Sequence, residues 1–234
     1  NTTVNTTMKK QNLLLRKNTQ KILNILGTNL EKIYKMGDII QKSLFIHIPK
    51  CGGTSVEDVC LKNNIKIDAL NCSTDWLNQK HKTNLYTDFH KEKDICFSFS
   101  FVRNPYSRLV SAWKTKWVGK KFRNKPFKEF IIRFCLNEKK YDWFRWRHVM
   151  PFTDPRAKII KKGEQVVDFI GKLENINEDF GFVKNKLGIS HQQLPHKNKT
   201  KHKHYTEYYD EETKSIVAEK YAKDIEYFGY EFGE

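Results

Sequence analysis

The sequence has no apolar run that approaches the roughly 20 residues of a membrane-spanning helix, and it has no signal-peptide pattern. It begins at Asn1 rather than at methionine, so we expect that a preceding segment is missing. None of its five cysteines forms a Cys-x-x-Cys pair, and no acidic pair is placed to hold a cation, so we expect no metal site. Because the cysteines are odd in number, at least one is unpaired unless it bridges two chains.

Acidic residues are also scarce relative to basic ones. The chain has 27 Asp and Glu against 43 Lys and Arg, which gives a formal net charge of +16. Such a protein attracts polyanions, which include nucleic acid, anionic lipid, acidic glycans, and phosphorylated or sulfated small molecules. Hydrophobic residues make up 38% of the 234 residues, which is enough for a core and excludes a disordered chain.

Apolar runs and helical spacing alternate along the chain, which predicts an α/β fold with a mostly parallel sheet. Continuous apolar runs predict buried strands, and apolar residues three or four positions apart predict helices. The predicted order is a strand over 43–48, a helix from 54, loops with short helices over 61–95, a strand over 95–102, a helix from 105, a helix after the basic loop near 125, a strand from about 166, a helix over 176–187, and a last helix after Asp210.

The first 42 residues are polar and basic, with helical spacing that we expect to end at Gly27. We therefore predict a stem-like lead-in helix over 1–42 and one domain over 43–234. Four glycosylation sequons, at Asn1, Asn5, Asn71 and Asn198, either arise by chance or fit a lumenal fragment of a membrane-anchored protein.

The stretch FIHIPKCGGTS, residues 45–55, combines a strand, a glycine loop and a helix start. In this arrangement backbone N–H groups and the helix N-terminus point at one spot, which suits an anion such as phosphate. Gly52 and Gly53 let the backbone approach the ligand closely, and Lys50 adds a full positive charge. The alternative is a tight turn whose glycines only permit positive φ. In the P-loop of NTPases the lysine follows the glycines, whereas here it precedes them.

A second basic motif follows the next predicted strand, in FSFSFVRNPYSRLVSAW, residues 97–113. Arg103 stands where the strand ends, and its planar guanidinium can bind a phosphate through two hydrogen bonds. Ser111 lies about 200° around the helix from Leu109 and Trp113, so it faces away from the apolar stripe. The alternative is that Arg103 forms an ion pair with a neighbour and Ser111 is simply exposed.

Together, HIPKCGGTS and the 97–113 motif resemble the 5′-phosphosulfate loop and the 3′-phosphate element of carbohydrate-type, Golgi-type sulfotransferases (sulfotransferase family 2). The resemblance covers about 43–232, with Cys51 where the family usually has threonine. It implies a P-loop-like three-layer fold and 3′-phosphoadenosine 5′-phosphosulfate (PAPS) as the sulfuryl donor. It also implies a hydroxyl-bearing acceptor, of which an anionic glycan fits the charge, and a Golgi-lumenal location, with the cytoplasm as the alternative. The implied donor-binding residues are Lys50, Cys51, Gly52, Gly53, Thr54, Ser55, Arg103 and Ser111.

In sulfuryl transfer an acceptor hydroxyl attacks sulfur in line while the 5′-phosphate leaves, so catalysis rests on positioning and charge stabilisation. Lys50 is suited to stabilise the oxygen that bridges phosphorus and sulfur. For the base that takes the hydroxyl proton we predict His81, in an H-x-T pattern similar to the family's, with His90 as the alternate. Both histidines are equally compatible with a basic surface loop. Glu57, on the first predicted helix, is a third candidate for the base, but we expect it to pair with a lysine instead.

Two other functions remain compatible with parts of the sequence. A nucleic-acid-binding protein explains the basic charge but leaves the two ordered motifs as coincidence, and we expect no specific nucleic-acid partner. A P-loop nucleotide kinase is disfavoured by the position of Lys50. A membrane is expected as a partner only through an anchor that would precede the sequence.

Overall fold

A computed structural model describes residues 17, 21–22, 24–29, 42–70, 74–92, 94–115, 125–136, 146–189, 191, 193–195 and 203–234. The chain divides into two compact units, residues 1–40 and 41–234. Most of the first unit lies outside the described residues, so the predicted division into 1–42 and 43–234 stays a prediction, as do the four sequons, which also lie outside. Within the described residues no helix combines the length and apolar composition needed to cross a membrane.

In the first unit, residues 24–29 are helical, and the expectation that Gly27 ends the helix is wrong. An interior glycine costs a helix only about 1 kcal/mol relative to alanine, so it does not by itself end one. The Thr28 hydroxyl donates to the carbonyl oxygens of Asn24 at 3.0 Å and Ile25 at 2.9 Å, which satisfies two carbonyls of the last turn.

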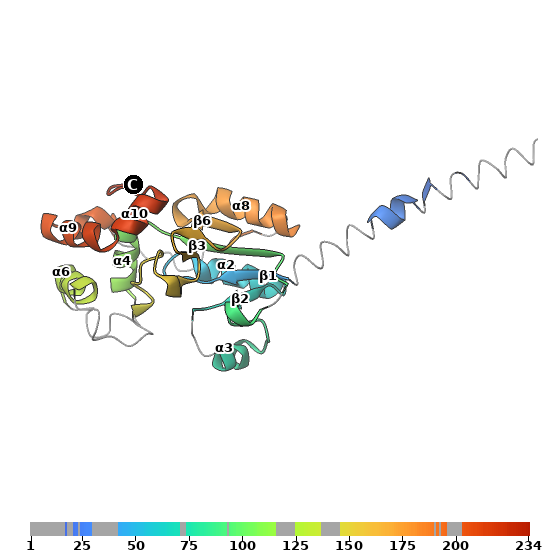
Figure 1. The fold of residues 1–234 in the computed structure, drawn as a ribbon, viewed down its shortest axis with the longest axis horizontal. Coiled ribbons are helices and arrows are strands. Elements are labelled where there is room, and N and C mark those ends of the chain that lie inside the picture. Colours follow the sequence, from blue (N-terminus) through green and yellow to red (C-terminus); the bar gives the residue numbers. More distant parts are fainter. Residues whose placement is uncertain are drawn as a thin grey trace, which may run out of the picture. The chain divides into compact units, whose positions relative to one another are not determined.

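Four parallel strands form the central sheet of the second unit, in the order β2-β1-β3-β6 (Figure 1). They are β1 Ser43–Ile46, β2 Lys66–Asp68, β3 Phe97–Val102 and β6 Phe169–Lys172. The predicted α/β fold with a mostly parallel sheet is therefore confirmed. Strand β2 was not predicted, because the three residues Lys-Ile-Asp show neither an apolar run nor alternation.

The helices of this unit follow the strands much as predicted. They are α2 Gly53–Lys62, α3 Thr74–His81, α4 Pro105–Trp113, α6 Phe127–Ile131, α8 Ile176–Leu187, α9 Glu211–Lys220 and α10 Ala222–Phe228. The predicted single closing helix is in fact α9 and α10, which meet at Tyr221 with φ −109° and ψ 20°. A short hairpin, β4 Ile160–Lys161 and β5 Glu164–Gln165, was also not predicted.

An aromatic layer holds α2 and α8 against one face of the sheet. Phe45 and Phe99 lie opposite each other on neighbouring strands, and their rings stack at 5.2 Å. Phe101 continues this face and meets Phe180 of α8 at 6.3 Å. Because all four strands are parallel, their carboxyl ends meet at one edge of the sheet, where the loops after β1, β2 and β3 come together.

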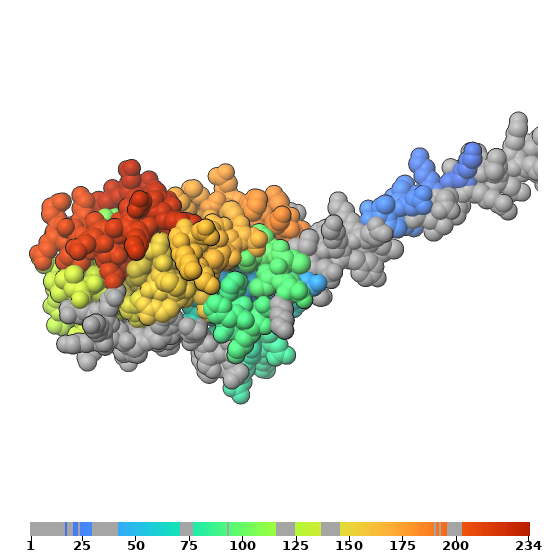
Figure 2. Space-filling view, viewed as in Figure 1, coloured from blue at the N-terminus to red at the C-terminus, as the bar shows by residue number. Residues whose placement is uncertain are grey.

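A second core joins α4, α6 and α9, where Trp113, Phe130 and Val217 are buried. The C-terminal helices also lie against the segment around residue 150, as Figure 2 shows in red and yellow. Here the buried Asp224 carboxylate accepts the backbone N–H groups of Phe152 at 2.7 Å and Thr153 at 2.9 Å. The C-terminal helices therefore fix the position of a segment that reaches the carboxyl edge of the sheet.

Candidate functional site

The loop after β1 turns through left-handed backbone at two positions, Lys50 with φ 73° and Gly52 with φ 75°. Such a conformation is uncommon for a residue with a Cβ, and it persists only where the surrounding structure enforces it. Gly52 is the N-cap of α2, and no side chain caps this helix start. An uncapped helix start of this kind suits an anion, so the predicted anion-binding role of this loop stays a prediction that the geometry permits.

Packing requires both glycines of this loop. A Cβ at Gly52 would lie 2.7 Å from Cδ1 of Leu173, which follows β6. A Cβ at Gly53 would lie 2.1 Å from two ring atoms of His47, a residue at the end of β1. A side chain at either position would therefore displace a neighbour.

The other predicted loop residues differ in what they can offer a ligand. Thr54 is exposed, whereas Ser55 is buried, and its backbone N–H donates to the Gly52 carbonyl at 3.0 Å. Cys51 is buried beneath the loop, and its thiol donates to the Pro49 carbonyl at 3.7 Å. Burial raises the pKa of the Cys51 thiol to about 11, so the side chain is neutral and only its backbone faces the loop surface.

Arg103 brings the second predicted motif against the first. It follows β3, and its Nη1 donates to the Lys50 carbonyl oxygen at 3.4 Å. Its Nε donates to the Ser107 hydroxyl at 2.8 Å. Both of these described hydrogen bonds go to uncharged oxygens, although the Glu174 carboxylate lies close enough to raise the pKa of Arg103 against the larger effect of burial. Ser111 is the partly exposed residue of α4, whose other eight residues are buried.

Positive charge is concentrated at this loop. Burial, the neighbouring Arg103 and, to a smaller extent, Arg108 lower the pKa of Lys50 from 10.5 to about 8. Burial also lowers the pKa of Arg103. Each lysine or arginine here opposes the charge of the next, and a bound anion would relieve that repulsion.

Arg108 is a structural residue of the site that the sequence analysis missed. It is 1% exposed and donates to three backbone carbonyls rather than to a carboxylate. These are Pro49 from Nε at 3.2 Å, Met150 from Nη1 at 2.6 Å and Arg147 from Nη2 at 3.2 Å. It thereby ties α4 to the loop and to the 146–150 segment. An arginine directly before Leu109, on the apolar side of a helix, was the signal available in the sequence.

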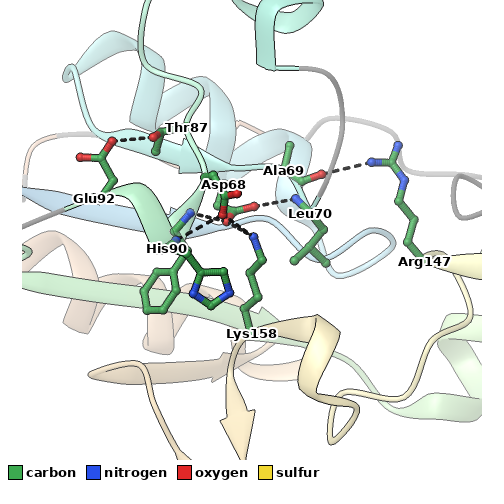
Figure 3. Close-up of polar contacts among 10 residues, drawn as sticks. Asp68, Ala69, Leu70, Thr87, His90, Glu92, Arg147 and Lys158 are labelled. Atoms are coloured by element: carbon green, nitrogen blue, oxygen red, sulfur yellow. Dashed lines mark hydrogen bonds and ion pairs between the residues drawn. The ribbon is translucent and has the colours of Figure 1, made fainter.

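The carboxyl end of β2 contributes a buried ionic cluster, shown in Figure 3. Lys158 Nζ lies 2.8 Å from Asp68 and 2.9 Å from Asp88, and both Lys158 and Asp68 are buried. Asp68 also accepts the N–H groups of Leu70 and Phe89. Burial opposes a charge on Lys158, but hydrogen bonds to the two aspartates raise its pKa, so Lys158 keeps its positive charge at neutral pH.

The two predicted bases lie in the connection between β2 and β3. His81 is the last residue of α3 and His90 lies in the short turn Phe89–Lys91, and both are exposed. Neither has a described contact with Lys50 or Arg103. The His81 ring lies 5.2 Å from that of Tyr86, whose hydroxyl donates to Glu57.

Glu57 lies on the second turn of α2. We had expected it to pair with a lysine, but its described partners are a tyrosine and a histidine. Its carboxylate accepts a hydrogen bond from Tyr86, and its Oε2 lies 3.6 Å from Nδ1 of His47. The expectation was wrong because the pattern of α2 gives no sign that a tyrosine thirty residues away and a strand-end histidine share its face.

Comparison with known proteins agrees with this geometry. Residues 40–231 match the sequence pattern of the sulfotransferase family. An uncharacterized protein of Archaeoglobus fulgidus is 34% identical over 93 residues, which cover 39% of this chain and 67% of that protein. No solved structure is a significant match. Since the family match spans most of the sequence and includes both predicted motifs, the chain belongs to the sulfotransferase family.

Proposed function

We propose that the protein transfers the sulfuryl group of PAPS to a hydroxyl of an anionic glycan. One observation carries this proposal: Arg103 donates to the carbonyl of Lys50, so the two anion-binding motifs form one site. A donor with phosphate groups at both its 5′ and 3′ ends requires two anion-binding motifs in one site. A nucleic-acid surface does not require the uncapped helix start or the left-handed loop.

The residues have separate proposed roles. The backbone of Cys51, Gly52 and Gly53, with the N-terminus of α2, holds the 5′-phosphosulfate, and the Thr54 and Ser55 hydroxyls lie beside it. Lys50 stabilises the bridging oxygen as its bond to sulfur breaks. Arg103 and Ser111 bind the 3′-phosphate. No metal has a role in this scheme. The prediction from sequence that His81 or His90 is the base is not part of this scheme, because neither has a described contact with Lys50 or Arg103.

The acceptor class rests on charge. The chain carries a net charge of +16, and Arg147 reaches the carbonyl of Ala69 at the carboxyl edge of the sheet, at 3.1 Å (Figure 3). A sulfated or carboxylated glycan would be attracted to such an edge. The sequons support a Golgi-lumenal location, which a shift in mass after endoglycosidase treatment of protein secreted from cultured cells would test.

Donor binding distinguishes the possible functions. We expect adenosine 3′,5′-bisphosphate to raise the Tm of the protein by several degrees at concentrations far above its Kd, and ATP with Mg²⁺ to have little effect. Lys50→Ala should abolish transfer of labelled sulfate from PAPS to a panel of glycans. Arg103→Ala should weaken bisphosphate binding more than acceptor binding.

The opposite pattern would reject the proposal. A Tm shift with ATP and Mg²⁺ alone would indicate a nucleotide kinase. Binding to random oligonucleotides that is lost at moderate salt, without a bisphosphate effect, would indicate a nucleic-acid-binding protein.

A further inference from the structure

His47 lies against the anion-binding loop, although the sequence analysis gave it no role. It directly follows β1, and its ring packs over Gly53, the first residue of α2. A Cβ at Gly53 would lie 2.1 Å from both Nε2 and Cδ2 of His47, so only a glycine permits this approach. The His47 side chain is 18% exposed, so it is not fully enclosed by the protein.

A carboxylate orients this ring. Glu57 Oε2 lies 3.6 Å from His47 Nδ1, and the Tyr86 hydroxyl holds the other carboxylate oxygen. Distances of this kind often shorten when substrate binds. A carboxylate beside Nδ1 favours the tautomer with the proton on Nδ1, so Nε2, the nitrogen next to Gly53, carries the free lone pair.

Burial, aided by two nearby cations, keeps the His47 ring neutral. Burial is the largest influence and lowers the pKa of His47 below its ordinary 6.5. Glu57 of α2 raises this pKa, whereas Arg147 of the 146–150 segment and Lys50 of the loop lower it. A histidine that is neutral at pH 7 and oriented by a carboxylate can accept a proton.

We propose that His47 is the catalytic base of the transfer and that Glu57 is its positioning residue. As the acceptor oxygen bonds to sulfur, its proton moves to Nε2 of His47. The bond between sulfur and the 5′-phosphate oxygen breaks, and adenosine 3′,5′-bisphosphate leaves with the bonding electron pair. This inference rests on the proposed sulfuryl transfer and concerns the same site.

The geometry favours His47 over the two histidines predicted from the sequence. His47 packs against the loop itself, whereas His81 is exposed, and its described contact is with Tyr86, which reaches His47 through Glu57. His90 is exposed at a turn whose backbone binds Asp68 and Asp88. Neither His81 nor His90 has a described contact with the loop that carries Lys50.

The test compares four histidine variants of the full chain for sulfate transfer from PAPS and for the Tm shift with adenosine 3′,5′-bisphosphate. We expect His47→Gln to lower turnover by about 10²- to 10⁴-fold, the usual contribution of a general base, while the bisphosphate shift is retained. His81→Gln and His90→Gln should change turnover by less than about threefold. The matched control, His191→Gln, changes an exposed histidine beyond the C-terminal end of α8. It should behave as wild type.

Two further measurements separate catalysis from structure. In His47→Ala, added imidazole should restore part of the turnover, because it can fill the space and accept the proton. In Glu57→Gln, the rise of turnover with pH should move to lower pH, because loss of the carboxylate charge lowers the pKa of His47 further. If His47→Gln does not fold, the pH shift in Glu57→Gln tests whether His47 is the base.

Full turnover in His47→Gln, with loss of turnover in His81→Gln or His90→Gln, would overturn the inference and leave the enzyme class intact. An unshifted pH profile in Glu57→Gln would also overturn it. Absence of any bisphosphate effect on the wild-type protein would instead reject the proposed function.

Discussion

Lys50 combines two unfavourable features in one residue. Its backbone is left-handed, with φ 73°, and its ammonium group is held near Arg103 in a partly buried place. Each feature costs free energy in the folded protein, and neither improves packing. Both become useful only when an anion binds, because the left-handed turn directs the backbone at the ligand and the ligand compensates the lysine charge.

The lowered pKa of Lys50 predicts that donor binding depends on pH. Anion binding favours the charged lysine, so affinity is full below the pKa of about 8 and falls as pH rises through it. We expect adenosine 3′,5′-bisphosphate to bind about tenfold more weakly at pH 9 than at pH 7, because about a tenth of the lysine then stays protonated. Titration calorimetry at both values measures this.

Lys50→Arg is the control, since arginine stays charged over this whole range. Its affinity should be nearly constant between pH 7 and pH 9. An equal loss of affinity in both proteins would show that a group other than Lys50 controls the binding.

Gly53→Ala tests the close approach of His47 to α2. The new methyl group would lie 2.1 Å from the His47 ring, so the ring must move and the loop must deform with it. We expect a lower Tm, and turnover reduced by at least tenfold from displacement of a group in the site, as about 1 Å of misplacement can cost a hundredfold. Gly181→Ala is the matched control, because a Cβ there has nothing within 4 Å and its backbone is helical.

At the level of elements, β2 shows how a short polar strand is fixed by tertiary contacts. It has three residues, and its last one, Asp68, is held by Lys158 from a distant turn and by two backbone N–H groups. Lys158 itself is left-handed, with φ 63°. The ionic cluster therefore connects β2, the β2–β3 connection and the turn before β4.

Lys158→Met should destabilise the protein strongly. The substitution removes the cation but leaves Asp68 buried, and loss of one partner of a buried ion pair costs about 3–5 kcal/mol. Urea denaturation measures the free energy of unfolding. Lys161→Met, at an exposed position of β4, should change it by less than about 0.5 kcal/mol. Similar values for both variants would mean that the cluster contributes nothing to stability.

Elements with local signals were predictable from the sequence, and those held by distant contacts were not. Pro105 and the Asn104 cap, which accepts the Tyr106 N–H at 3.0 Å, defined the start of α4 correctly. Strand β2 has no local signal, because its burial depends on Lys158, ninety residues away. The split of the last predicted helix at Tyr221 likewise depends on a distant contact, since its hydroxyl donates to the Val149 carbonyl.

At the level of the whole molecule, the site residues that could be predicted were those that belong to one of the two sequence motifs. Lys50, the glycines and Arg103 come together as their order along the parallel strands requires. Arg108, His47 and Arg147 were not found, because each acts through a fold-dependent contact with a carbonyl or a carboxylate. A single sequence shows which side chains can bind an anion, but not which of them are brought to the same edge.

The division of the chain into two compact units predicts that donor binding needs only the second unit, residues 41–234. A chain that starts at residue 41 retains every described residue of the loop, of α4 and of the ionic cluster. We expect it to bind adenosine 3′,5′-bisphosphate with the affinity of the full chain, within about twofold, since no residue of the donor site is removed. Calorimetry on both proteins checks this, and a tenfold weaker affinity would mean that residues 1–40 contribute to the site.

The three carbonyls around Arg108 have a consequence for the protein in the cell. They accept hydrogen bonds from Arg108 without neutralising its charge, and this charge adds to those of Lys50 and Arg103 at the loop. Inorganic phosphate or sulfate in the surrounding medium would be drawn to the same spot. Donor uptake is then an exchange in which a small inorganic ion must first depart, and the apparent affinity for PAPS will vary with the inorganic anions of the medium.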